Sequence, residues 1–221
     1  MSNPWQYFLD HRSEVDSLLG TTLWLGAVPV VVGLAVALPI GWTAYRYRWA
    51  YPPIVSAAGI LYTIPSLVLF LVMPGILGTR ILNPINVAVA LSLYTVALLV
   101  RVVADGLAAV SAETLSAATA MGFSAWQRLI KVQLPIAVPV IGAGVRVAAV
   151  SNVSLVSVAS IIGISQLGQL FVDANNSPSP SEAVNPAVVG LVIFFIIAIA
   201  FDLIILAAMR LLTPWNRAVR S

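Results

Sequence analysis

The chain has 221 residues, 60% of them hydrophobic and 9% charged, with a formal net charge of +3 and no cysteine. An ordinary soluble domain is about a quarter charged, so this chain cannot cover its surface with polar groups, which excludes an ordinary soluble fold. Without cysteine it can form neither a disulfide framework nor a thiolate metal site. The basic residues lie near the ends of apolar runs, where they report membrane topology rather than binding to nucleic acid.

An acidic segment opens the chain. Asp10, Glu14 and Asp16 surround Arg12 before the first long apolar run. A secretory signal needs a basic segment at this place, so we expect no cleavage. We predict that residues 1–20 form a tail outside the membrane.

Five apolar stretches follow, each long enough for the roughly 20 residues of helix that cross a bilayer. They are continuous rather than alternating, which favours helices over strands. We therefore predict an all-α, polytopic membrane protein with about five transmembrane helices in one domain, residues 1–221. The predicted spans are residues 21–45, 53–77, 85–108, 135–163 and 186–212.

The distribution of charge predicts the orientation. If the C-terminus is cytoplasmic, eight basic residues lie inside and two, Arg12 and Arg80, lie outside. The positive-inside rule favours this arrangement, which puts the N-terminus and the loop 164–185 outside. The basic residues predicted to be cytoplasmic are Arg46, Arg48, Arg101, Arg128, Lys131, Arg210, Arg217 and Arg220.

Residues 109–134, between the third and fourth predicted spans, are too polar to cross the membrane and too apolar for a mobile linker. Ser111 can cap a first short helix, and Gly122 can end it in the left-handed conformation. Ser124 and Gln127 fit a capping box that begins a second helix. We predict a cytoplasmic loop made of two short helices.

The spacing of residues in this loop is specific. Three small residues beginning at Ser116 are followed after three residues by Gly122, and nine residues later by a segment that ends in Leu134 and Pro135. This pattern closely resembles the EAA-x3-G-x9-I-x-LP loop of binding-protein-dependent ABC importer permeases of type I. It departs from that pattern where Ser116 replaces glutamate and Val132 replaces isoleucine. The residues that the resemblance assigns to the loop are Ser116, Ala117, Ala118, Gly122, Leu134 and Pro135.

The resemblance implies the fold and the partners. In this family the first loop helix, the coupling helix, docks into a groove of an ATP-binding subunit. We therefore expect a pair of ATP-binding subunits, a second permease subunit, an extracytoplasmic substrate-binding protein and a lipid bilayer as partners. We expect no nucleic acid, and no cofactor in this chain.

Three further segments are similar to permeases for osmoprotectants such as glycine betaine, carnitine and choline. They are residues 61–67, residues 144–146 and residues 162–168. Ser165 and Gln166 interrupt the usual glycine-rich form of the last segment. The predicted function is thus a permease subunit of an osmoprotectant importer in the cell membrane. The alternatives are a permease for another small solute such as an amino acid, or a secondary transporter or channel that needs no ATPase.

The sequence lacks the motifs of the common hydrolases. Lys131 is the only lysine and follows Ile130 rather than glycine, so no phosphate-binding P-loop is present. His11 is the only histidine, which excludes histidine-based zinc motifs and triads. We expect that this chain is not an enzyme and that a partner subunit hydrolyses ATP.

Several polar residues in the spans are candidates for the translocation pathway. Pro65 should break the second span and free backbone carbonyl groups beside Thr63 and Ser66. The rings of Tyr62 and Tyr94 could hold a quaternary ammonium by cation–π contact, although packing in the core would also explain them. Two polar residues of the fourth span, Asn152 and Ser154, complete the candidates.

Charged residues inside spans need a partner or a function. Arg146 and Asp202 both lie roughly 15 to 17 Å from the cytoplasmic side, at 1.5 Å per helical residue. We predict that they form an ion pair between two helices, either as a structural clamp or in contact with solute. Arg101 and Asp105, one turn apart, can pair with each other.

Overall fold

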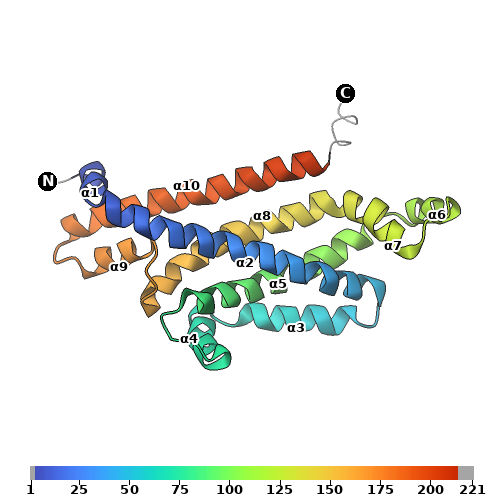
Figure 1. Cartoon of the computed structure of the whole chain (residues 1–221), viewed down its shortest axis with the longest axis horizontal. Helices are drawn as coiled ribbons and strands as arrows, with labels where there is room; N and C mark the ends of the chain where they lie inside the picture. The colour runs from blue at the N-terminus through green and yellow to red at the C-terminus, as the bar shows by residue number, and fades with distance from the viewer. Residues whose placement is uncertain (1–2, 214–221) are drawn as a thin grey trace. The chain divides into compact units, whose positions relative to one another are not determined.

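The computed structural model describes residues 3–213, which form twelve helical segments and no strand. The predicted all-α fold is therefore confirmed. Arg217 and Arg220 lie outside the described residues. In chain order the segments are α1 (Pro4–Asp10), α2 (Arg12–Arg46), α3 (Tyr51–Thr63), α4 (Ser66–Leu77), α5 (Pro84–Ala108), α6 (Ala112–Ala120), α7 (Ala125–Arg128), the π-helical turn η1 (Leu129–Gln133), α8 (Leu134–Val158), the 3-10 turn η2 (Ala159–Ile162), α9 (Gln169–Asn176) and α10 (Pro180–Leu212) (Figure 1).

Among the described residues, four continuous helical stretches are long and apolar enough to cross a membrane. Three are the long helices α2, α5 and α10, and the fourth runs from Ala125 to Ile162 through α7 and α8. The bent pair α3 and α4 counts as a fifth span if it is taken as one broken element. The protein is therefore a multi-pass membrane protein.

The second span is interrupted where Pro65 predicted a break. Helix α3 ends at Thr63 and α4 begins at Ser66, while Pro65 itself is extended, with φ −59° and ψ 133°. Proline disfavours the helical conformation of the residue before it and cannot donate a backbone hydrogen bond. The chain therefore leaves the helix at Ile64 and starts a new one after the proline.

The predicted tail and the predicted loop 164–185 are more helical than hydropathy indicated. The segment 1–20 contains α1, capped by a box of Asn3 and Gln6, and α2 begins at Arg12 rather than at residue 21. The segment 164–185 contains α9 and the first turns of α10. Hydropathy detects the part of a helix that is apolar enough for lipid, whereas a helix continues until a residue breaks it.

The described chain divides into two compact units. Unit 1 comprises residues 3–32, 64–93 and 149–201, and unit 2 comprises residues 33–63, 94–148 and 202–213. Four long helices contribute a segment to each unit, so each unit is a bundle of helix segments.

Unit 2 is built around the second half of α5, where Leu99, Val103 and Leu107 have no exposed surface. Helix α3 lies antiparallel beside it, since the ring of Tyr62 meets Tyr94 and Tyr51 reaches Asp105 (Figure 1). On α2, Gly33, Ala37 and Gly41 recur at four-residue spacing and are buried. At Gly41 a Cβ atom would lie 2.8 Å from the carbonyl oxygen of Val100, so small residues allow α2 and α5 to pack closely.

Helix α8 packs against both α5 and α10 in unit 2. A Cβ atom at Gly144 would lie 2.6 Å from Val102 of α5, and one at Gly142 would collide with the side chain of Met209 of α10. These close approaches hold the first half of α8 in an antiparallel position beside each neighbour. This arrangement determines which polar residues of α8 and α10 meet.

Unit 1 has its own apolar core, to which α2, α8, α9 and α10 contribute. The hydroxyl group of Thr22 accepts a hydrogen bond of 2.9 Å from the backbone N–H of Leu167 and donates one to the carbonyl of Leu18. The buried Gln166 accepts from the N–H of Gly168 and donates to the carbonyl of Ser157. These bonds fix the non-helical segment before α9. The core residues are Val15, Leu18, Val153, Leu167, Leu170, Val189, Phe194 and Ile197.

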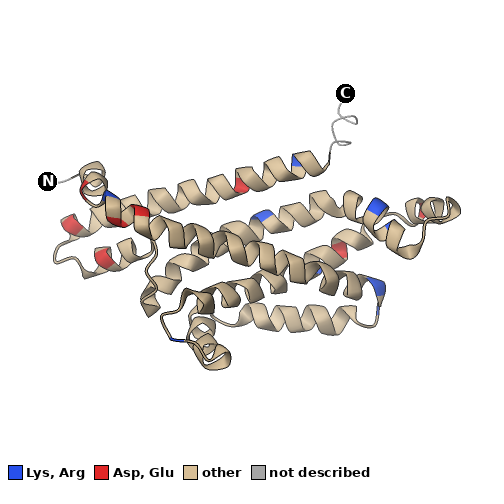
Figure 2. Cartoon of the chain, viewed as in Figure 1, with Lys and Arg blue, Asp and Glu red and all other residues tan. Residues whose placement is uncertain are grey.

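Charge differs between the two units. The described part of unit 1 carries five acidic and two basic residues, with the acids on α1, α9 and the starts of α2 and α10 (Figure 2). The described part of unit 2 carries three acidic and seven basic residues. Among the described residues, the net charge is therefore negative in unit 1 and positive in unit 2.

Candidate functional site

The predicted two-helix loop lies in unit 2. Ser111 caps α6 by accepting a hydrogen bond from the N–H of Thr114, and Glu113 lies in the positive first turn. Beyond α6, Gly122 has φ 83°, the left-handed conformation in which a Cβ atom is unfavourable. A capping box of Ser124 and Gln127 begins α7. The local structure predicted from the sequence is confirmed at each of these positions.

A π-helical turn connects the loop to the fourth span. In η1, the N–H of Leu134 bonds to the carbonyl of Leu129, five residues earlier. Pro135 follows directly and has no N–H to continue an α-helical ladder. The π turn, with its extra residue, therefore lies directly before the position where proline lacks an N–H, and α8 continues beyond it. Sequence reasoning did not predict this turn.

Side chains anchor the loop to the end of α2. The indole ring of Trp126 on α7 meets Trp42 edge-on, with ring centroids 6.4 Å apart. The side-chain amide of Gln133, which is buried, donates a 2.7 Å hydrogen bond to the hydroxyl of Tyr45. The loop is therefore linked to two spans, to α8 by chain continuity and to α2 by these contacts.

Within the loop, Arg128 donates a hydrogen bond to the hydroxyl of Thr119, which ties α7 to α6. Of the motif residues on α6, Ala118 is buried at 2% exposure, while Ser116 and Ala117 are exposed. Helix α6 thus packs on one side and presents small residues on the other. Such a slim face can enter a groove of a partner.

Arg146 and Asp202 lie together in unit 2. The Nε atom of Arg146 donates to Oδ1 of Asp202 at 2.6 Å, and Nη2 donates to Oδ2 at 2.8 Å. The side chains retain 36% and 28% of their exposure in this single chain. Helices α8 and α10 therefore hold a two-point ion pair whose outer edge is not covered by the chain itself.

Of the candidate pathway residues, Tyr62 and Tyr94 are adjacent in unit 2. Their rings meet edge-on, with centroids 5.7 Å apart and an interplanar angle of 83°. Tyr94 is buried at 5% exposure, whereas Tyr62 is 45% exposed. The pair therefore presents one accessible tyrosine ring, supported by a buried one. Thr63, which ends α3 next to Tyr62, bonds to the carbonyl of Ile60.

The remaining pathway candidates belong to unit 1. Pro65 and Ser66 lie at the start of α4, and Asn152 is buried within α8. Ser154 is exposed and lines a cavity of about 350 Å³ together with Ser157, Phe171 and Phe194. The rings of Phe171 and Phe194 stack with centroids 5.7 Å apart. The hydroxyl of Ser154 therefore faces a space with aromatic walls.

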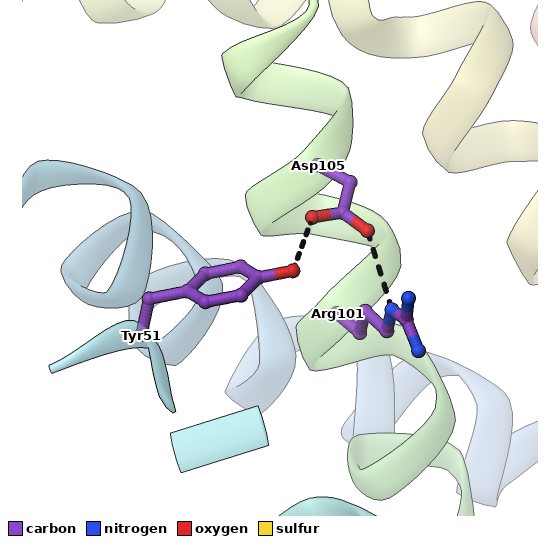
Figure 3. A network of polar contacts seen from close by, with 3 residues as sticks. All are labelled: Tyr51, Arg101 and Asp105. Carbon is purple, nitrogen blue, oxygen red and sulfur yellow. Dashed lines mark hydrogen bonds and ion pairs between the residues drawn. The ribbon is translucent and has the colours of Figure 1, made fainter. Parts of the chain in front are cut away.

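A polar network joins α3 to α5 in unit 2 (Figure 3). The hydroxyl of Tyr51 donates a 2.7 Å hydrogen bond to Oδ1 of Asp105, and the Nε atom of Arg101 lies 3.4 Å from Oδ2. The pairing of Arg101 with Asp105 agrees with their i, i+4 spacing. The role of Tyr51 was not predicted, because nothing in its local sequence indicates a partner 54 residues away.

Among residues 3–213, no group of three or more His, Cys, Asp or Glu side chains is arranged to hold a metal ion. Within unit 2, a helical hairpin is linked to two spans, and the same unit carries an ion pair and one exposed tyrosine ring. Together with the multi-pass helical fold, these features define a helical membrane protein with a structured loop between two of its spans.

Comparison with known families agrees with this class. A family model described as "Binding-protein-dependent transport system inner membrane component" matches residues 23–217. The chain therefore belongs to this family, whose members are the permease components of ABC importers.

Curated relatives cover nearly the whole chain. It is 32% identical over 211 residues to the osmoprotectant import permease protein OsmW of Salmonella typhimurium, covering 94% of this chain and 96% of the relative. It is 27% identical over 195 residues to the glycine betaine/carnitine/choline transport system permease protein OpuCB of Bacillus subtilis, covering 88% and 87%. A choline transport system permease protein of the same organism, OpuBB, is 28% identical over 190 residues, with 86% and 84% covered.

Solved structures share the fold. An inward-facing structure of the MetNI methionine ABC transporter aligns with a TM-score of 0.72 at 21% identity, covering 94% of this chain and 99% of the other. An amino acid ABC transporter aligns with a TM-score of 0.72 at 19% identity, covering 95% and 99%. These similarities extend the type I importer permease fold to this chain.

Proposed function

We propose that this chain is the permease subunit of an ATP-driven importer for osmoprotectants of the quaternary ammonium class, such as glycine betaine, carnitine or choline. The observation that carries the proposal is the 32% identity, over 94% of the chain, to a permease named for osmoprotectant import. Relatives named for glycine betaine, carnitine and choline transport support the same class. The amino-acid transporters that share the fold are more distant in sequence.

The partners follow from the family. A pair of ATP-binding subunits would receive α6, and a second permease subunit, either a copy or a paralogue, would complete the transmembrane pathway. A substrate-binding protein would deliver the solute from outside the cell. The chain itself needs no cofactor for this role.

The orientation proposed here places unit 2, with its coupling loop, at the cytoplasmic side and the N-terminus outside. The described part of unit 2 has seven basic and three acidic residues. This surplus of basic residues supports the proposed orientation, because basic residues are enriched on the cytoplasmic side.

The coupling mechanism uses the anchors of the loop. Closure of the ATP-binding pair would displace α6, and the displacement would pass through α7 to α8 and through Trp126 and Gln133 to α2. Relative movement of spans changes access to the pathway from the two sides. Hydrolysis would then return the subunits to the resting arrangement.

The solute would pass residues that suit a cationic group without N–H donors. A quaternary ammonium is attracted to the face of an aromatic ring, and Tyr62 offers a ring that is 45% exposed. Thr63 and the break at Pro65 place polar backbone groups next to it in the chain.

The experiment is reconstitution of the permease with its ATP-binding subunits and binding protein in proteoliposomes that contain ATP. We expect ATP-dependent uptake of radiolabelled glycine betaine, carnitine or choline, and competition among them. Methionine and histidine, tested in parallel, should be neither transported nor competitive. Uptake of an amino acid without uptake of any quaternary ammonium would refute the substrate class, and uptake without an ATPase would refute the importer assignment.

A further inference from the structure

A cleft of about 520 Å³ lies in unit 2, between the last turn of α2 and the coupling loop. Arg46 and Arg48 line it from α2 and the segment after it, and Arg128 lines it from α7. Ser116 of α6 also lines it. A second cavity, of about 440 Å³, adjoins it and shares Arg48 and Tyr45. The end of α2 therefore forms one wall of the cleft and the coupling loop forms the other, and three guanidinium groups line it.

These three charges have no carboxylate partner in the described part of the chain. The ion pairs found there involve Arg12, Arg101 and Arg146. The side chain of Arg128 donates a hydrogen bond to the uncharged hydroxyl of Thr119. Like charges gathered in a concave site raise the potential and attract an anion. A guanidinium group binds a phosphate through two parallel hydrogen bonds, so the cleft has the chemistry of a phosphate site.

Ser116 strengthens this conclusion. It stands where the EAA pattern of ABC importer permeases has a glutamate, and it lines the cleft. A glutamate at this place would put a carboxylate among the arginines and supply a counter-charge from within the chain. The serine instead leaves the positive charge uncompensated and adds a hydroxyl group, which can donate a hydrogen bond to an anion.

The position of the cleft relative to the bilayer indicates the source of the phosphate. Arg46 is the last residue of α2, a helix that can span the membrane, so the cleft lies at the level where the apolar span ends. Trp42 and Tyr45 line it, and Tyr47 and Trp49 beyond it are 47% and 79% exposed. Tryptophan and tyrosine are enriched at the level of lipid headgroups.

We propose that this cleft binds the headgroup phosphate of an anionic phospholipid, with Arg46, Arg48 and Arg128 as its ligands. The bound lipid bridges the end of α2 and the coupling loop. This inference does not depend on which solute the permease transports. An acidic segment of the ATP-binding subunit is the competing occupant, and the experiment separates the two.

The test uses the purified full-length permease and a soluble short-chain phosphatidylglycerol, with phosphatidylcholine and inorganic phosphate as comparison ligands. We expect saturable binding of phosphatidylglycerol that is much tighter than binding of either comparison ligand. Each basic residue near a membrane surface contributes about 1 kcal/mol of attraction to anionic lipid, which corresponds to about a fivefold change in affinity. Arg46→Gln, Arg48→Gln and Arg128→Gln should therefore each weaken binding about fivefold.

Ser116→Glu is the sharper variant, because it keeps all three arginines and supplies the missing carboxylate. It should weaken binding of phosphatidylglycerol by at least the same factor. Ala117→Glu is its matched control, since Ala117 is exposed on the same helix and does not line the cleft. Arg210→Gln, an exposed arginine at the end of α10, controls for general loss of charge. Both controls should bind as the unchanged protein does.

Three outcomes would overturn the proposal. Equal affinity for phosphatidylglycerol and phosphatidylcholine would show that no anionic site exists, and equally tight binding of inorganic phosphate would assign the site to a free anion. Loss of phosphatidylglycerol binding when the ATP-binding subunits are added would assign it to that partner. Circular dichroism and thermal unfolding of each variant verify that a loss of binding does not reflect a loss of fold.

Discussion

Arg146 and Asp202, 56 residues apart in the chain, are joined by two hydrogen bonds of 2.6 and 2.8 Å between α8 and α10. Both hydrogen-bond donors come from one guanidinium group and both acceptors from one carboxylate, so the contact fixes the rotation of each helix as well as their separation. The depth of the two residues in their spans predicted that they could meet.

If the pair is a structural clamp, Asp202→Leu should lower the apparent melting temperature of the purified permease. The variant leaves the guanidinium of Arg146 in the spans without its counter-charge. The double variant Arg146→Leu with Asp202→Leu removes both charges and should recover most of the loss. Thermal unfolding in a single detergent, with fluorescence-detected size exclusion, measures both effects.

Arg101→Leu provides the control for this experiment. Arg101 also belongs to an ion pair, but its side chain is 68% exposed and that of Asp105 is 48% exposed, so its loss should change stability little. A double variant as unstable as the two single variants combined would contradict the clamp. A stable double variant that transports nothing would assign the pair to solute contact.

Gly122→Val should reduce ATP-driven uptake while ATP hydrolysis and membrane insertion persist. Gly122 has φ 83°, and a Cβ atom there would meet nothing within 4 Å, so the penalty is conformational rather than steric contact with a neighbour. A β-branched residue in this region costs at least about 1–2 kcal/mol. The turn between α6 and α7 should therefore relax and reorient α6. Uptake and ATPase rates measured on the same proteoliposomes give the coupling ratio, and an unchanged ratio would contradict the assignment of the coupling loop.

Gly41→Ala should destabilise the permease by about 1–3 kcal/mol, the usual cost of overpacking. The added Cβ atom would lie 2.7 Å from Cβ of Val103 and 2.8 Å from the carbonyl oxygen of Val100, and the backbone oxygen cannot move away freely. Gly59→Ala is the matched control, because a Cβ atom there meets nothing within 4 Å in helix α3. It should be neutral or slightly stabilising, since alanine favours helix. Chemical denaturation of both variants checks the difference, and equal stability would mean that α2 and α5 are not closely packed at Gly41.

The proposed topology is testable with single cysteines, because the natural chain has none. Ser181→Cys, on an exposed residue at the start of α10, should react with a membrane-impermeant thiol reagent in intact cells. Ala120→Cys, on an exposed residue at the end of α6, should react only after lysis. Ala120 is preferable to Ser124, whose side chain caps α7. Labelling of position 120 in intact cells would reverse the orientation.

The features of the loop that were predicted from sequence depend on residues close together in the chain. A cap acts on the N–H two or three residues ahead, so Ser111 and Ser124 could be identified as helix starts without knowledge of the fold. Gly122 and Pro65 were also predictable, because each restricts its own backbone or that of its neighbour. Hydropathy predicted about five spans, and the described residues contain four, or five if α3 and α4 are counted as one broken span.

The contacts that anchor the loop could not be predicted, because they depend on how helices rotate and pack. Gln133 and Tyr45 are 88 residues apart, and no local pattern indicates that one bonds to the other. The same applies to Trp42 and Trp126 and to the pairing of Tyr51 with Asp105. Hydropathy gives the depth of a residue in its span, which suggested the Arg146–Asp202 pair, but it does not give the direction in which the side chain points.

The π-helical turn at Leu129–Gln133 has a consequence for the length of the coupling loop. Each residue of an α-helix rotates the chain by about 100° around the helix axis and advances it by 1.5 Å. Deleting one residue from this turn would restore a regular α-helix, and it would swing α7 and α6 through about 100° around the axis of α8. The number of residues between Gly122 and Pro135 therefore sets an angle, namely the direction in which α6 projects from the fourth span towards its partner.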